Sequence, residues 1–303
     1  MRSELVRELD ECRLCPRSCG ARRSAGERGF CGALASARIA RADLHFWEEP
    51  CISGKNGSGA VFFSGCTMRC VYCQNRELSA ANLGYDITEE ELAGEYLRLQ
   101  EEGAENINLV TPTQYIPQIV SSVEAARGMG LTVPVVYNTG GYETERSLML
   151  LYGTVDVYLP DLKYMSGETA AKYSAAKDYP EIAKKAIDVM FEQVGEPVFE
   201  GGLMKKGVII RHMLLPGHLA ETIKIINYVH KRFGDRVWFS LMSQYTPLRR
   251  FEKFPELDHR VDPKCYEAAE EHCVKLGMEH VFVQEGAAAD ESFIPEFFGE
   301  RQM

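Results

Sequence analysis

The chain has 303 residues and a formal net charge of −10, and 45% of its residues are hydrophobic. This length suits one α/β barrel or two smaller domains, and the composition is that of a globular protein. The negative charge disfavours a nucleic-acid partner, because such proteins usually present a basic face to phosphates. Because no signal peptide and no apolar run of about 18 residues is recognisable, we expect a cytoplasmic protein without a membrane partner.

The first 58 residues differ in character from the rest of the chain. A cysteine-rich stretch between Cys12 and Gly32 is followed by a segment rich in glycine, proline and serine. Neither a helical nor a strand period is strong enough here to predict an independent core. We therefore interpret residues 1–58 as a small Cys-rich N-terminal extension that could hold a second metal site.

From Ala60 onward, short apolar segments alternate with longer amphipathic ones, which predicts alternating strands and helices. Thr88 and Glu91 form a capping-box pattern at the start of the first helix. The predicted strands span 60–65, 106–112, 133–140, 155–163, 207–217 and 236–245, with a seventh candidate at 280–286. The predicted helices span 88–102, 115–129, 143–152, 180–194, 219–233 and 263–276.

Strand followed by helix, repeated six times, predicts parallel strands joined by crossover helices. The strands are apolar on both faces, as buried parallel strands are. Polar residues end all six strands rather than clustering at one switch point, which favours a barrel over an open sheet. We therefore predict an α/β fold, a partial (β/α)6 TIM-like barrel over residues 59–290, followed by a C-terminal tail at 291–303.

Three cysteines follow the first predicted strand with the spacing Cys-x3-Cys-x2-Cys. They are Cys66, Cys70 and Cys73. Three thiolates so close together can bind three irons of a cubane [4Fe-4S] cluster and leave the fourth iron open to a small molecule. A structural zinc usually takes four ligands from paired short loops, and no fourth Cys or His follows nearby. The motif therefore predicts an iron–sulfur cluster.

The cysteine motif resembles the Cys-x3-Cys-x-aromatic-Cys pattern of the radical S-adenosylmethionine (SAM) superfamily, with Tyr72 as the aromatic residue before Cys73. The resemblance implies that SAM binds the open iron. One electron from the cluster would then cleave SAM to a 5′-deoxyadenosyl radical, which abstracts a hydrogen atom from a substrate. An electron donor such as flavodoxin or ferredoxin would be the partner.

Longer stretches are similar to the PflX group of pyruvate formate-lyase activating enzyme homologues. These stretches span 45–54, 103–113, 135–142, 155–164, 211–217 and 241–247. The resemblance implies an activating-enzyme-like oxidoreductase whose substrate is a glycyl radical enzyme, another macromolecule or a small metabolite. The alternative is a non-catalytic iron–sulfur electron carrier or sensor, which would not need the polar strand ends.

The resemblance also assigns roles to polar residues at the strand ends. Asn138, Thr139 and Asp161 match positions that bind a monovalent cation beside the SAM carboxylate in formate-lyase activating enzymes. Asn138 replaces an Asp of that family, which removes one negative charge. Thr111 and Thr113 stand where many radical SAM proteins have Gly-Gly-Glu, so either one could hold the SAM amino group.

Three basic residues are candidates for a catalytic role. Lys163 and Arg211 match basic positions that face SAM in the activating enzymes, and a salt bridge at the barrel rim is the alternative for both. His212 is the third candidate. A histidine after a buried strand is as often a hydrogen-bonded core residue as an acid or base.

Four further cysteines lie in the extension, with the spacing Cys-x2-Cys-x3-Cys-x11-Cys. They are Cys12, Cys15, Cys19 and Cys31. Four thiolates complete either a structural zinc site or a second iron–sulfur cluster, and the spacing is typical of neither. A second cluster would suggest electron delivery, whereas zinc would fold a segment that lacks its own core. Because these residues lie outside the predicted barrel, we expect SAM binding to survive their loss.

Overall fold

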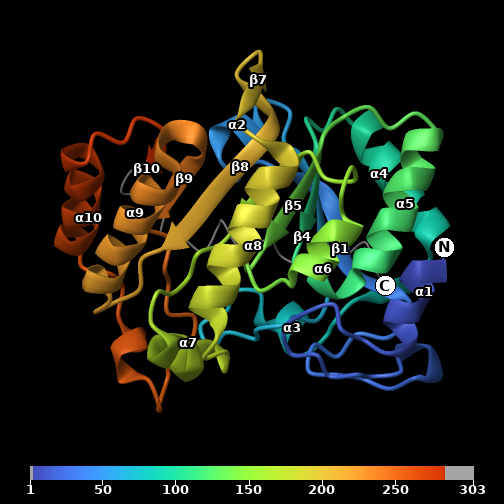
Figure 1. Ribbon diagram of the computed structural model, residues 1–303, viewed down its shortest axis with the longest axis horizontal. Coiled ribbons are helices and arrows are strands. Elements are labelled where there is room, and N and C mark those ends of the chain that lie inside the picture. The colour runs from blue at the N-terminus through green and yellow to red at the C-terminus, as the bar shows by residue number, and fades with distance from the viewer. Residues whose placement is uncertain (1–2, 284–303) are drawn as a thin grey trace.

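The computed structural model describes residues 3–283 and shows an α/β fold built on one mostly parallel sheet (Figure 1). Along this part of the chain, the strand order is β10-β9-β8-β6-β5-β4-β2-β1-β3. The parallel strands are β2 (Ser58–Phe63), β4 (Ile107–Val110), β5 (Val135–Thr139), β6 (Val157–Pro160), β8 (Leu203–Met213), β9 (Trp238–Met242) and β10 (Val281–Val283). The predicted α/β fold is confirmed, and the sheet is consistent with a partial barrel. The predicted tail at 291–303 and the end of the seventh predicted strand lie outside the described residues.

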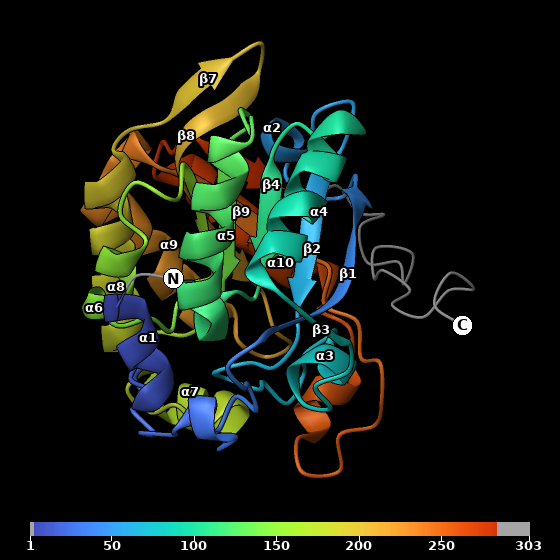
Figure 2. The same ribbon diagram turned by 90° about the vertical axis from the view of Figure 1, so that its right-hand side faces the viewer.

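Helices connect the parallel strands and cover the outside of the sheet (Figures 1 and 2). The six predicted helices are present as α4 (Glu89–Glu101), α5 (Ile116–Gly128), α6 (Glu145–Leu150), α8 (Tyr179–Val194), α9 (Leu219–Phe233) and α10 (Pro263–Lys275). The predicted capping box is confirmed, because the Thr88 hydroxyl accepts from the Glu91 N–H at 3.2 Å and the Glu91 carboxylate accepts from the Thr88 N–H at 2.9 Å. Two backbone donors at the start of α4 are thereby satisfied.

The N-terminal extension contributes a strand to the sheet, which the sequence pattern did not predict. β1 (Ala37–His45) pairs antiparallel with β2, and β3 (Tyr85–Ile87) pairs antiparallel with β1. Charged residues interrupt the apolar alternation of β1, and its outer positions are half-buried. The remaining short elements are α1 (Ser3–Asp10), α2 (Pro50–Ser53), α3 (Arg76–Ser79), α7 (Gly167–Ser174), β7 (Val198–Glu200) and 3-10 turns at Arg23–Ala25, Thr113–Tyr115, Gly234–Arg236 and Pro255–Asp258.

The core lies between the parallel sheet and its helices. All six residues of β2 and all five of β5 are buried, as expected for strands covered on both faces. Among the described helices, none has both the length and the apolar character that a membrane span requires. In Figure 2 the arrowhead of β2 points towards α3, α7 and the N-terminal segment, so these elements surround the carboxyl ends of the parallel strands.

Candidate active site

A cavity of about 250 Å³ lies at the carboxyl ends of the parallel strands. This is the edge where α/β barrels place their functional groups. The cavity brings together most of the residues that the sequence predicted for the site. They are Cys66, Cys70, Tyr72, Cys73, Thr111, Asn138, Thr139, Asp161, Lys163 and Arg211. Side chains from five different strand ends therefore face one space.

The cysteine loop follows β2 and begins with a tight turn at Gly65, whose φ of +81° is in the left-handed region. The turn aims the following thiols into the cavity. The Cys66 sulfur accepts the backbone N–H groups of Met68 and Arg69 at 3.3 and 3.5 Å. These donors favour the thiolate, which is the form that binds iron, but burial outweighs them and raises the pKa of the Cys66 thiol to about 12.

The other two thiols of the loop have hydroxyl donors. Ser174 at the end of α7 donates to the Cys70 sulfur at 2.9 Å, and Ser79 at the end of α3 donates to the Cys73 sulfur at 3.3 Å. All three cysteines are half-buried and line the same cavity. This donor set fits a cubane cluster held through three irons. Hydrogen bonds to the ligating sulfurs are one of the means by which proteins tune such clusters.

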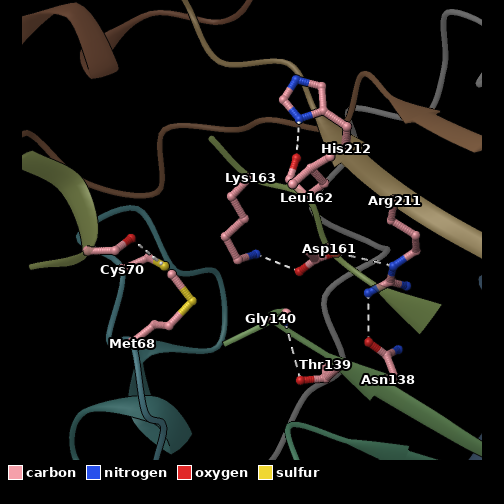
Figure 3. A network of polar contacts seen from close by, with 12 residues as sticks. Met68, Cys70, Asn138, Thr139, Gly140, Asp161, Leu162, Lys163, Arg211 and His212 are labelled. Carbon is pink, nitrogen blue, oxygen red and sulfur yellow. Dashed lines mark hydrogen bonds and ion pairs between the residues drawn. The ribbon is translucent and has the colours of Figure 1, made fainter. Parts of the chain in front are cut away.

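A buried network of charges lines the wall of the cavity opposite the cysteine loop (Figure 3). Asp161, after β6, is approached by the Lys163 ammonium at 2.5 Å and by the Arg211 guanidinium at 3.3 Å. Arg211 also pairs with Glu48 at 3.0 Å and donates to the Asn138 side-chain oxygen at 2.7 Å. Two cations and two carboxylates therefore share one wall.

The charges in this network hold one another in the ionised state. Burial opposes ionisation of Asp161, but Lys163 and Arg211 outweigh it, and the pKa of this carboxyl is lowered. Burial likewise opposes the charge of Lys163, and Asp161 raises its pKa above the ordinary value. The predicted salt bridges of Lys163 and Arg211 are thus present, and both side chains still line the cavity. The Asn138 and Asp161 oxygens, expected to bind a monovalent cation, contact these two basic side chains.

Thr111 stands out in the backbone geometry of the site. Its φ is 58°, a left-handed conformation that is unusual for a β-branched residue. The strain is held by two hydrogen bonds, from the Thr111 N–H to the Asn138 carbonyl at 2.9 Å and from the Gln114 side chain to the Thr111 carbonyl at 2.7 Å. Strained residues of this kind concentrate at functional sites, and Thr111 lines the cavity.

Thr113 points away from the cavity into the core beneath it. Its hydroxyl donates to the buried Glu143 carboxyl at 2.7 Å, and the Thr139 hydroxyl donates to the same carboxyl oxygen. Burial raises the pKa of Glu143 to about 7. Between the two threonines proposed from the sequence, only Thr111 borders the cavity.

The structure also places His212 outside the cavity. Its Nδ1 contacts the Leu162 carbonyl at 2.8 Å and its Nε2 contacts the Thr222 hydroxyl at 2.9 Å. In Figure 3 the ring points away from Asp161 and Arg211. Burial lowers the pKa of His212 to about 4, so the ring is neutral at physiological pH. This arrangement is the hydrogen-bonded core histidine that the sequence left open.

Glu48 is a site residue that the sequence reasoning missed. It lies in the connection after β1, and its carboxylate accepts from Arg211 at 3.0 Å and from the Asn108 amide at 2.9 Å. Its neighbour Trp47 also lines the cavity, and 57% of Trp47 is exposed. The segment 45–54 was noted only for its family resemblance. No local pattern shows that a strand from the extension brings Glu48 to Arg211.

The cysteines of the extension lie outside the cavity but against the cysteine loop. The Arg17 guanidinium donates to the Thr67 carbonyl at 3.0 Å, and the Arg69 guanidinium lies 5.1 Å from the centre of the Phe30 ring. A Cβ atom on Gly65 would lie only 2.5 Å from the carbonyl oxygen of Cys31. The extension therefore packs on the loop, whereas the sequence suggested a separable module.

Comparison with known proteins shows the family. Residues 60–229 match the family model of the radical SAM superfamily, which is more than half of the chain. The chain belongs to the radical SAM superfamily. Membership supports SAM as the cosubstrate and a [4Fe-4S] cluster as the cofactor, and the cavity contains the three thiols and the charged wall that would hold them.

Two relatives illustrate the extent of the similarity. An uncharacterized protein of Methanocaldococcus jannaschii is 28% identical over 281 residues, which cover 89% of this chain and 76% of that protein. The crystal structure of Streptococcus suis SuiB bound to S-adenosylmethionine superposes with a TM-score of 0.50 at 11% identity, over 73% of this chain. The match covers 48% of the SuiB chain, so this chain spans about half of SuiB, and the similarity shows the fold alone.

Proposed function

We propose that this radical SAM enzyme is an activating-enzyme-like oxidoreductase that generates a radical on a protein substrate. The observation that supports it best is the convergence of Cys66, Cys70 and Cys73 with the charged wall on one cavity. When bound, the cluster would supply one electron to SAM, and cleavage of the S–C5′ bond would then yield methionine and the 5′-deoxyadenosyl radical for hydrogen-atom abstraction. The residues of the chain bind and orient the reactants.

The charged wall complements the amino-acid part of SAM. SAM carries an α-carboxylate, an α-ammonium group and a sulfonium ion. Lys163 and Arg211 supply positive charge for the carboxylate, while Asp161 and Glu48 supply negative charge for the cationic groups. Because each charge is already paired with its neighbour, the wall is ordered before SAM arrives. Thr111, fixed in its left-handed conformation, lines the same space.

Apolar side chains line a further part of the cavity and would limit the access of water there. They are Phe62, Phe63, Met68, Leu78, Val110, Met213 and Met242. A reactive radical needs such a site, because exclusion of solvent prevents side reactions. Phe46 and Trp47 lie exposed on the connection after β1, and Trp47 reaches the cavity. Exposed aromatic residues beside a cavity suit docking of a macromolecule rather than a small metabolite.

The similarity of segments 135–142 and 155–164 to the PflX group of pyruvate formate-lyase activating enzyme homologues supports a glycyl radical enzyme as the substrate. The test is anaerobic incubation of the reduced protein with SAM and candidate glycyl radical enzymes. We expect a glycyl radical signal in electron paramagnetic resonance (EPR) spectra and an equal amount of 5′-deoxyadenosine. If 5′-deoxyadenosine forms and no candidate gains a radical, the glycyl radical assignment is wrong and the radical chemistry stands.

A further inference from the structure

The four cysteines of the extension converge in space although regular secondary structure does not hold them. The thiols of Cys12 and Cys15 both lie close enough to those of Cys19 and Cys31 to interact with them electrostatically. Three of the four are buried and Cys19 is exposed. Between α1 and β1 the only regular element is a three-residue 3-10 turn, and contacts such as those of Arg17 and Arg23 with the barrel hold the segment, to which a bound metal centre would add order.

The sulfurs of the extension share a local hydrogen-bond pattern with the cysteine loop. The N–H of Leu14 donates to the Cys12 sulfur, and the N–H of Arg17 donates to the Cys15 sulfur. In both cases the donor lies two residues after the cysteine. Cys66 receives the N–H of Met68 at the same offset. The extension thus offers thiols in the geometry seen at a ligand of the family cluster.

Gly29 keeps space around one of these thiols. A Cβ atom at this position would collide with the sulfur of Cys19 and would lie 3.4 Å from its Cβ. Any side chain at residue 29 would therefore displace the thiol from its present place. The requirement for glycine links the chain before Cys31 to the position of the Cys19 sulfur.

A buried positive charge near the Cys12 thiol has no carboxylate partner among the described residues. Arg23 is 1% exposed, and its guanidinium donates to the backbone carbonyls of Leu34 and Gln114. It lies near enough to Cys12 to interact with it electrostatically. Burying an unpaired cation costs free energy, so a negative charge bound near Arg23 would stabilise the fold. A centre with four thiolate ligands carries such charge.

The arrangement of the thiols bears on the choice between the two centres that the sequence left open, a structural zinc and a second cluster. In a tetrahedral zinc site, sulfurs at about 2.3 Å from the metal lie about 3.8 Å apart. Within residues 3–283, no three Cys, His, Asp or Glu side chains are close enough to share one ion. The same holds for Cys66, Cys70 and Cys73, whose family cofactor spreads its thiolates over different irons. The four thiols of the extension share this property with the three thiols of the loop, which is compatible with a cubane.

We propose that Cys12, Cys15, Cys19 and Cys31 bind a second [4Fe-4S] cluster, distinct from the cluster of the radical SAM motif. The centre would lie between solvent and the first cluster, because Cys19 is exposed while the backbone of Cys31 packs on Gly65, next to Cys66. In Figure 2 this N-terminal segment lies at the lower end of the molecule, beside α7.

This position suits a cluster that accepts electrons from a donor protein and passes them to the first cluster. A low-potential donor protein, a flavodoxin or a ferredoxin, transfers one electron to the second cluster and is itself oxidised by one electron. Passing that electron inward returns the second cluster to its oxidised state, so the relay itself is not consumed. The exposed side at Cys19 is where the donor would approach.

The test counts metal in variants that lack one cysteine group each. The first variant combines Cys66→Ala, Cys70→Ala and Cys73→Ala, and the second combines Cys12→Ala, Cys15→Ala, Cys19→Ala and Cys31→Ala. Each protein is reconstituted anaerobically, and iron, zinc and acid-labile sulfide are measured per chain. We expect about eight irons in the wild type and about four in the first variant, whose reduced form gives a cubane EPR signal. This readout does not depend on SAM cleavage.

Iron-free protein, or one zinc in place of iron in the folded first variant, would overturn the proposal. Circular dichroism establishes whether that variant is folded. If it is unfolded, the wild type decides alone: about eight irons with two EPR signals support a second cluster, and about four irons with one signal contradict it. Failure of the proposed SAM chemistry would leave these counts unchanged.

Discussion

Two groups of cysteines can be compared, the loop with Cys66, Cys70 and Cys73 and the segment from Cys12 to Cys31. Their sulfurs have similar hydrogen-bond donors, but their surroundings differ. Both direct backbone N–H groups at sulfur. The loop follows a buried parallel strand and faces a cavity with a charged wall, whereas the N-terminal segment packs on the back of that loop and lines no part of the cavity.

The difference shows what separates a reactive centre from a supporting one. Three ligands beside a cavity would leave one iron open to a cosubstrate, and the charged wall would hold that cosubstrate in place. Four ligands in a packed segment would complete the coordination of a cluster and leave no iron open. Chemistry is thus expected at the first group, and support or electron supply at the second.

The largest expected difference is in SAM cleavage, between a variant that lacks a loop cysteine and one that lacks a cysteine of the extension. Cys70→Ala should lower SAM cleavage by at least about a thousandfold, because the cluster loses one of three ligands. Cys15→Ala, assayed with a strong chemical reductant such as dithionite, should lose no more than about tenfold. The measurement is 5′-deoxyadenosine formed per chain, with Cys265→Ala as the control. Equal losses in both variants would remove the distinction between the two groups.

The contact between the two groups can be disturbed without touching a cysteine. Gly65→Ala would place a Cβ atom 2.5 Å from the Cys31 carbonyl at a positive φ, so the loop and the extension must move apart. We expect a loss of iron on gel filtration and a fall in SAM cleavage of more than about tenfold. Gly94→Ala in α4 is the matched control, because its Cβ meets no atom within 4 Å. Wild-type iron content in Gly65→Ala would show that the contact is dispensable.

Glu48→Gln tests whether the charged wall binds SAM. The change removes one negative charge from the proposed binding site of SAM, which carries a net positive charge. We expect the KM for SAM to rise about tenfold, equivalent to about 1.4 kcal/mol, with a smaller effect on kcat. Glu271→Gln, on the exposed surface of α10, is the control. An unchanged KM would exclude Glu48 from SAM binding.

His212 should have the smallest effect on catalysis, with His212→Gln retaining SAM cleavage within about threefold. Its contribution appears in stability. Burial lowers its pKa from about 6.5 to about 4, so the folded state favours the neutral ring. The stability it contributes is full above pH 6.5 and falls by about 3 kcal/mol as the pH drops to 4.

Denaturant unfolding of the wild type and His212→Gln at several pH values measures this contribution. The difference in unfolding free energy between the two proteins should shrink as the pH falls from 6.5 to 4. A difference that does not change with pH would show that the ring does not titrate as its surroundings require. If folded His212→Gln lost SAM cleavage, His212 would have a role in catalysis.

The repeating strands and helices could be predicted from the sequence because local patterns of apolar and capping residues determine them. The capping residues Thr88 and Glu91 begin α4 where the pattern placed it, and six parallel strands lie within the predicted segments or close to them. The antiparallel strand β1 was missed because its pairing with β2 is a tertiary property and its charged residues hide the strand period.

The same reason limits the prediction of the site. Residues at or near the carboxyl ends of strands, such as Asp161 after β6 and Arg211 late in β8, could be placed at one edge of the barrel from the fold class alone. Glu48 lies in the extension and contacts Arg211, and Thr113 points into the core and contacts Glu143. The positions of these residues in the sequence do not show where their side chains point. The packing of Cys31 against Gly65 likewise depends on contacts distant in sequence.

The most direct test of the central claim is SAM cleavage by the wild-type protein. The chain is reconstituted without oxygen, its iron and sulfide are quantified, and it is incubated with SAM and a strong reductant. We expect 5′-deoxyadenosine and methionine in equal amounts, detected by mass spectrometry, only when the reductant is present. If protein with its full iron content cleaves no SAM, it is an electron carrier or sensor, and the account of the cavity is wrong.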